Sequence, residues 1–236
     1  GDDGACHMMI AGGIIGGRLP SVAFVASGVN TTNPIRTVNF TNRSLGEEHP
    51  SRRIIVLVFG DNANLVSDSN YTTAVTVGGV AATRKVQPPG PSSAHLTAWI
   101  TPRLDAGGPQ GATGTITVER SIGNGFLTAA MVAFAAYDLR EDNPYDFGFA
   151  SFSAPFTASL ALRGGGILTA MAYSGDEQFS FAWIGANVQS NDVGGVGSGI
   201  RWSAALLNRT PSTDAHTVIA DNGRPSGVRM LAVSWR

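Results

Sequence analysis

Four carboxylates lie close together in one short stretch of the chain, which makes it the first place to look for chemistry. Residues 138–146, DLREDNPYD, contain Asp138, Glu141, Asp142 and Asp146. Ca²⁺ prefers several carboxylate oxygens on a bendable loop, so these four side chains are a candidate calcium site. The stretch lacks the alternating D-x-D-x-D-G pattern of calcium loops, and an ordinary solvated turn is the favoured interpretation. No other metal or cofactor is expected.

Patterns of catalytic residues are missing from the rest of the sequence. The four histidines are scattered without the short spacings of metal sites. No G-x-S-x-G nucleophile motif occurs, and residues 195–199, GVGSG, have neither its spacing nor the Lys-Ser/Thr of a phosphate loop. Nothing selects two carboxylates for glycoside hydrolysis. The sequence therefore predicts a protein that is not an enzyme.

Aromatic side chains are the remaining candidates for binding, because a flat ring can stack on the face of a sugar. Trp99 and Trp235 lie in apolar runs, which indicates core positions. Tyr145 lies in a polar loop, and Trp183 and Trp202 flank the Gly-rich segment 194–199. We expect these last three rings, Tyr145, Trp183 and Trp202, to be the surface contacts for a ligand.

Composition excludes several classes of partner. Only 14% of the residues are charged, against a usual quarter or so, and the formal net charge is −1. Nucleic-acid binding would require a basic stripe, and none is visible. No apolar run is long enough to span a bilayer, so membrane insertion is not expected. The single cysteine, Cys6, rules out an internal disulfide framework and is interpreted as a spare thiol in a flexible arm.

The strand-forming centre of the chain is residues 52–86. Residues 54–59, IIVLVF, are too short for most helices and rich in β-branched residues, which predicts a strand buried on both faces. Residues 73–83 form two short β-branched runs hinged on Gly78-Gly79, a pair that supplies the positive φ angles of a tight hairpin. We expect the hairpin to pack against the central strand.

Short alternating runs separated by turn residues continue along the chain, and no helical block is evident. Residues 126–137 are rich in alanine, which also suits a helix, but the turns on either side favour a long central strand. The pattern predicts an all-β fold: an antiparallel β-sandwich of jelly-roll type, with no visible internal repeat and with the last strand packed near the first. The expected strands are 21–27, 35–41, 54–59, the hairpin 73–83, 95–101, 113–120, 126–137, 147–153, 157–162, 167–173, 178–184, 200–206, 215–219 and 228–235.

Two units follow from this pattern: residues 1–19 as an extended, Gly-rich N-terminal arm, and residues 20–236 as one β-sandwich domain. No basic region precedes an apolar segment, so a secretory signal is not expected. His7-Met8 is compatible with a cloning junction, and Gly1 equally with removal of an initiator methionine. Free Gly-rich arms are rarely ordered, so we expect a partner subunit to hold the arm.

Four segments of the chain resemble a recurrent module of bacteriophage and prophage virion proteins. They are RRIIVLVFG (52–60), AVTVGGVAAT (74–83), LTAWIT (96–101) and TGTITVER (113–120). Similar modules occur in head decoration proteins, head fibres or spikes, and tail-associated proteins, including those of gene transfer agents. The resemblance covers about residues 20–137, more loosely the final strand, and brings no catalytic residues. The arm and the longer body after residue 145 depart from the module.

The resemblance implies a non-enzymatic structural protein on the surface of a phage-like particle, made in the bacterial cytoplasm. A capsid decoration or head-fibre protein would dock on capsid or tail proteins through the arm, as a symmetric homo-oligomer, with a trimer as the first expectation. The alternative is a carbohydrate-binding adhesin or tail-associated receptor-binding protein that attaches to host polysaccharide. A polysaccharide-degrading enzyme is a more distant alternative.

Overall fold

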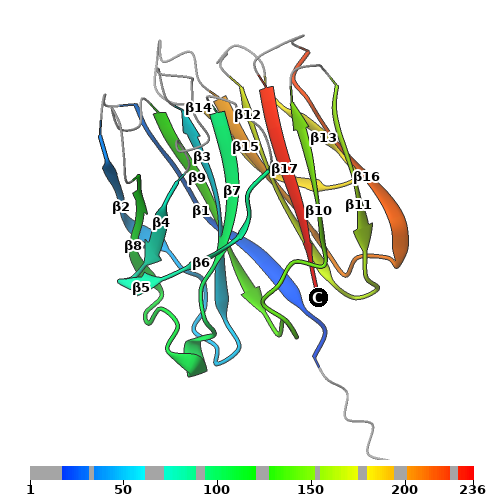
Figure 1. Ribbon diagram of the computed structural model, residues 1–236. Coiled ribbons are helices and arrows are strands. Elements are labelled where there is room, and N and C mark those ends of the chain that lie inside the picture. The colour runs from blue at the N-terminus through cyan, green and yellow to red at the C-terminus, as the bar shows by residue number, and fades with distance from the viewer. Residues whose placement is uncertain are drawn as a thin grey trace, which may run out of the picture.

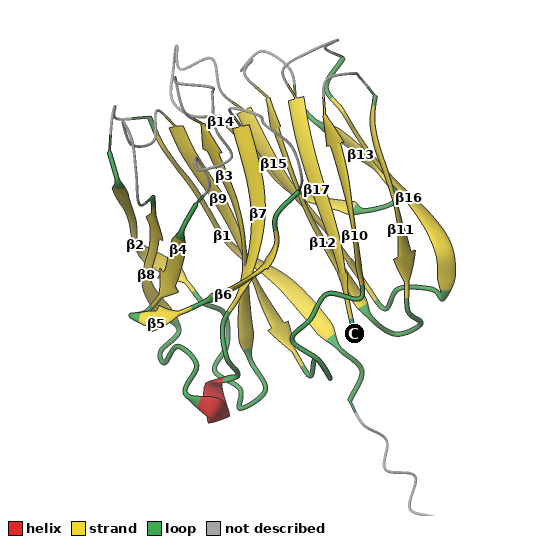
Figure 2. Ribbon diagram, in the orientation of Figure 1, coloured by secondary structure: helices red, strands yellow, loops and turns green. Residues whose placement is uncertain are grey.

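The computed structural model confirms an all-β protein of antiparallel sheets (Figure 2). Among the residues that it describes, the only helical element is the short 3-10 turn η1 (Leu104–Ala106). No helix there is long and apolar enough to cross a membrane. The described residues are 18–31, 35–61, 72–88, 94–120, 128–151, 155–174, 180–193, 201–223 and 228–236.

The first half of the chain forms two sheets. A five-stranded sheet has the order β1-β9-β3-β7-β6, and a four-stranded sheet has the order β2-β8-β4-β5. The strands are β1 (Ser21–Asn30), β2 (Thr37–Ser44), β3 (Arg53–Asp61), β4 (Ala74–Val77), β5 (Val80–Ala81), β6 (Thr83–Val86), β7 (Ala94–Ile100), β8 (Thr113–Glu119) and β9 (Thr128–Tyr137).

The second half repeats this arrangement. Its five-stranded sheet has the order β10-β17-β12-β15-β14, and its outer sheet has the order β11-β16-β13. The strands are β10 (Asp146–Ser151), β11 (Phe156–Leu162), β12 (Ile167–Ser174), β13 (Ala182–Ile184), β14 (Asn187–Val193), β15 (Arg201–Asn208), β16 (Thr213–Asp221) and β17 (Val228–Trp235). When the two-residue strand β5 is left out and the strands are numbered in chain order within each half, each strand of the second half has the position of its counterpart in the first.

Strand register makes the repeat specific to the residue. In the first half Leu57 pairs with Ala98 and Val132, and in the second Met171 pairs with Ala204 and Leu231. With Leu57 aligned to Met171, the edge strands β6 and β14 carry a bulge at equivalent positions. The bulge follows Arg84 in β6 and Val188 in β14. Shared strand order and a shared bulge indicate a structural repeat within the chain.

The four sheets stack as four layers, with the five-stranded sheets in the middle and the smaller sheets outside (Figure 1). Three apolar cores fill the spaces between layers. The central core joins the two halves and includes Leu57, Phe134, Met171 and Leu231, while each outer core lies within one half. The chain is therefore one packed body rather than two tethered ones.

A single aromatic pair marks the middle of this body. Phe59 of β3 and Tyr173 of β12 are equivalent by register, and their rings stack with centroids 3.4 Å apart and planes 14° from parallel. Equivalent side chains that contact each other lie where a two-fold axis relating the halves would pass. The two halves therefore pack face to face in an approximately two-fold manner.

The sequence predicted the centre of the first half correctly. Residues 54–59 are fully buried on both faces of β3, and residues 126–137 contain the central strand β9 rather than a helix. The hairpin forms as expected, with Val77 opposite Val80 and positive φ at Gly78 and Gly79. It packs on β3 through Val75 and Val77, which share a core with Val56.

The last strand, β17, lies in the central core with the first strand, β1, and pairs with β10 and β12 of its own half. Two other expectations were wrong. An internal repeat exists although the sequence shows none. The strands β6 and β14 had no expected counterpart, while only residues 182–184 of the expected strand 178–184 are described as β. The jelly-roll designation stays a prediction, and residues 1–17 of the expected arm lie outside the described residues.

Candidate functional site

Residues 18–20 lie at one end of the stack, beside the C-terminal strand (Figure 1). A side chain of the other half holds β1 there. Asn208, the last residue of β15, accepts a hydrogen bond from the Val22 amide at 2.6 Å and donates one to the Val22 carbonyl at 2.8 Å. An amide side chain can do both because it carries a donor and an acceptor. The first strand is thus fixed to both halves.

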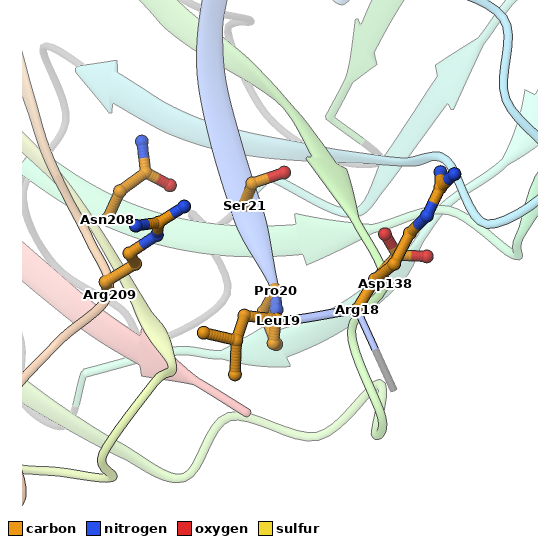
Figure 3. Close-up of a pocket in the computed structure, with 7 residues that line it drawn as sticks. All are labelled: Arg18, Leu19, Pro20, Ser21, Asp138, Asn208 and Arg209. Atoms are coloured by element: carbon orange, nitrogen blue, oxygen red, sulfur yellow. The ribbon is translucent and has the colours of Figure 1, made fainter. Parts of the chain in front are cut away.

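A pocket of about 570 Å³ surrounds this point (Figure 3). Its lining combines apolar Leu19 and Pro20 with the charged side chains of Arg18, Asp138 and Arg209. Asp138 and Arg209 have positive φ, 56° and 54°, although neither is glycine. Such backbone costs free energy, more for Arg than for Asp, and persists where the surrounding structure imposes it. A third such residue, Asn42, lies in β2 outside this pocket.

A second pocket shares Leu19 and Pro20 with the first and is lined by three arginines. Arg140, Arg163 and Arg236 line it together with the backbone of Gly164–Gly166. The Arg163 guanidinium lies 4.7 Å from the centre of the Tyr145 ring, and Arg236 forms an ion pair with Glu141. The Gly165 amide donates to the Thr210 carbonyl at 2.8 Å, which ties the glycine turn to the neighbouring loop.

A third pocket continues around Arg18 toward the first half. It is lined by Glu47, His49, Tyr137 and Asp138 in addition to Arg18 and Ser21. Arg18 Nη1 lies 3.2 Å from His49 Nε2, and the Tyr137 hydroxyl donates to the Glu47 carbonyl at 3.1 Å. Burial raises the pKa of Tyr137, so its phenol stays protonated at neutral pH and acts as a donor.

Positive charge dominates this surface, which we call the arginine end. The three pockets share five arginines, Arg18, Arg140, Arg163, Arg209 and Arg236, against two lining carboxylates, Glu47 and Asp138. Arginine presents a planar fork of donors that matches carboxylate and phosphate oxygens. The arginine end can therefore hold an anionic group next to the apolar side chain of Leu19, which is 52% exposed.

Reasoning from the sequence missed the arginine end. Four of its arginines, Arg140, Arg163, Arg209 and Arg236, directly follow or lie within three residues of the ends of β9, β11, β15 and β17. Those strands all run toward the same end of the stack, so their following residues converge. The sequence does contain a single arginine soon after each of these four strands, but only the order of the strands in the sheets shows that the four arginines lie at one end of the protein.

The three aromatic candidates are not brought together. Tyr145 is partly buried under Arg163 and adjoins the arginine end. Trp183 lies in β13, partly exposed, and its Nε1 donates to Ser203 Oγ at 2.8 Å. Trp202 is 3% exposed in the central core, so the expected surface position of this ring was wrong. The core positions predicted for Trp99 and Trp235 are confirmed.

The acidic loop does not assemble a calcium site. Asp142 pairs with Lys85 at 3.2 Å, Glu141 pairs with Arg236, and Asp138 lines the arginine end. Asp146 Oδ2 accepts a hydrogen bond from the Ala161 amide at 2.6 Å. Each carboxylate thus has a different neighbour, and no three His, Cys, Asp or Glu side chains of the described chain converge as metal ligands. The calcium candidate is withdrawn on this geometry.

Comparisons with known proteins add no relative. No family model, no curated protein and no solved structure matches the chain.

Proposed function

We propose that this chain is a non-enzymatic structural protein on the surface of a phage-like particle, where its N-terminal segment docks it to capsid or tail proteins. The observation that carries the proposal is the position of residues 18–20, fixed between the two halves over the pockets of the arginine end. The segment before Arg18 therefore starts from the same surface that offers the five arginines. Segment and surface together suit attachment to an acidic partner.

The segments that resemble virion proteins support the same assignment. All four lie in the first half, on β3, on the β4–β5 hairpin, on β7 and on β8. They build both sheets of that half and one face of the central core, which agrees with the structural role that we propose. The proposal includes display on the virion surface after synthesis in the bacterial cytoplasm, as a symmetric oligomer.

Docking to particles that lack this protein tests the proposal. Protein without residues 1–19 should stay folded and soluble but no longer co-sediment with the particles, and Arg140→Ala/Arg163→Ala should weaken co-sedimentation of the full chain. Thr157→Ala, an exposed change on β11, is the control that should dock normally. Unchanged docking of the truncated protein would refute the role of the segment.

A second function, adhesion to host polysaccharide, is favoured by Tyr145. This partly buried ring lies under the exposed guanidinium of Arg163 and holds it at the arginine end, where it can contact the carboxylate of an acidic sugar. Labelled protein should then bind host cells and lose binding when their surface polysaccharide is removed. Binding that is equal with and without the polysaccharide would exclude this second function.

A further inference from the structure

The internal repeat provides a comparison between two edge strands that occupy the same place. Thr83 of β6 pairs with Ile100, and Asn187 of β14 pairs with the equivalent residue, Leu206. The next residues, Arg84 and Val188, are also equivalent, and in each strand the register shifts directly after them. Lys85 therefore corresponds to Gln189. Each strand ends its sheet, with no further strand paired on its outer side among the described residues.

Strand β6 is protected against pairing with another chain. Its Arg84 guanidinium lies 5.7 Å from the centre of the Trp99 ring. Lys85 Nζ binds Asp142 Oδ2 at 3.2 Å and Asn143 Oδ1 at 2.9 Å, which connects the edge to the second half. Charged residues, lysine in particular, on an edge strand are a common means of blocking edge-to-edge association.

Strand β14 lacks this protection. At the positions of Arg84 and Lys85 it carries Val188, which is 50% exposed, and Gln189. Ile184, at the end of neighbouring β13, is 65% exposed. No charged residue occurs between Ala182 and Ser190. The one charged residue of β14, Asp192, comes after this neutral stretch. An unpaired edge with an uncharged, partly apolar stretch of this kind is a template for strand addition.

We propose that the β14 edge pairs with the β14 edge of a second copy of this chain, in an antiparallel arrangement about a two-fold axis. A second copy fits because the segment from Ala182 to Ser190 is neutral, so self-pairing places no like charges opposite each other. The equivalent pairing through β6 would bring Arg84 and Lys85 of both copies together. Joined edges would merge two five-stranded sheets into one and cover Ile184 and Val188 of both copies.

The solution mass of the free, full-length protein tests this pairing, which does not depend on docking to a particle. Light scattering and sedimentation over a concentration series should give twice the mass of one chain. Val188→Arg/Gln189→Lys, which gives β14 the charges of β6, should halve that mass. Ile184→Lys changes a side chain already largely in solvent, so it should weaken the dimer without affecting folding.

A matched control places the same charges on a solvent-facing strand surface. Thr157→Arg/Ser159→Lys on β11 should leave the dimer intact, since both side chains are exposed and neither lies on β13 or β14. Circular dichroism of every variant verifies folding. A wild-type monomer at all concentrations, a trimer, or a dimer that persists in both the β14 double variant and Ile184→Lys would each overturn the proposal.

Discussion

The side chain of Arg52 carries a charge and is fully buried. It lies between two loops of the first half and donates to the Gly46 carbonyl at 3.1 Å and to the Pro109 carbonyl at 2.5 Å. Buried backbone carbonyls need donors, and a charged donor forms a stronger bond than a neutral one. Arg52 thus fixes the loop before β3 against the loop before β8.

We predict that Arg52→Met lowers the free energy of unfolding by about 1–3 kcal/mol, because two buried carbonyls lose their donors while the volume is kept. Urea denaturation followed by fluorescence measures the change. Arg103→Met is the matched control: its ion pair with Asp105 is exposed, so the change should stay within about 0.5 kcal/mol. Equal effects of the two substitutions would contradict the assigned role of Arg52.

A second residue-scale prediction concerns pH. The hydrogen bond from Lys85 lowers the pKa of Asp142, so the folded state favours the ionised carboxylate. The stabilisation is present above the unfolded pKa of about 4 and is lost as pH falls through the lower folded pKa. Asp142 is half exposed, so the pair contributes only about 0.2–1 kcal/mol.

Asp142→Asn should therefore be less stable than the wild type at neutral pH and equal to it in strong acid. Parallel urea titrations of both proteins across the acid range measure this difference. A difference that is the same at neutral pH and in strong acid would show that the charge of Asp142 is not involved. High salt at neutral pH should also shrink it, because the pair is exposed.

The sequence correctly predicted which tryptophans are buried in inner strands, but it wrongly predicted an exposed position for Trp202. Trp99 and Trp235 were recognisable as core because apolar neighbours surround them in their strands. Trp202 was not, because the face of β15 that carries it lies against the first half, and a sandwich with two faces would have exposed it. The sequence also did not show that the two halves stack, so it did not show that Arg140 and Arg163 line one pocket.

At the scale of elements, the β4–β5 hairpin shows how local geometry was predictable. Two glycines with φ of 55° and 81° close the turn between Val77 and Val80. A Cβ atom at Gly79 would contact nothing within 4 Å, so any cost of substitution there comes from the backbone alone. Side chains disfavour positive φ, and asparagine tolerates it better than most residues.

Gly79→Ala should therefore destabilise the protein by about 1 kcal/mol, and Gly79→Asn by clearly less. Thermal and urea unfolding of the two variants measure the order. The comparison is internally controlled, since both variants add a side chain to the same open position. An alanine variant as stable as the asparagine variant would mean that the turn does not impose its positive φ.

The strands β6 and β14 escaped prediction for a physical reason. Each is an edge strand interrupted by a bulge, so polar and apolar residues do not alternate along it as they do in β8. Edge strands also have one side free of partners, which removes the pressure for β-branched residues. Regular inner strands such as β3 and β9 were found because both of their faces are buried.

At the scale of the whole molecule, the repeat was not visible in the sequence because a buried position on a sheet face requires an apolar residue but not a particular one. The equivalent positions Leu57 and Met171, or Val132 and Leu231, need similar burial rather than the same side chain. The all-β class followed from composition and alternation. The four-layer arrangement did not, because nothing in an alternating strand states whether its outer face meets water or another sheet.

A shared central core predicts that the two halves unfold together. Phe59→Ala should cost about 3–5 kcal/mol and lower the protection of both halves, because Phe59 packs on Tyr173 across the core. Hydrogen exchange read separately on β9 and β17 measures this, with Tyr173→Phe as the control that retains the ring. Loss of protection in β9 alone would show that the halves are independent.

Fractionation of particles from the organism that encodes the chain tests the central claim, that the chain belongs to a phage-like particle. Lysates are separated on a density gradient, each fraction is assayed for nuclease-protected DNA, and an antibody against this chain locates the protein. The account predicts that the chain peaks with the protected DNA and that gold-labelled antibody decorates the particle surface in electron micrographs. A chain confined to fractions without particles, with unlabelled particles, would contradict it.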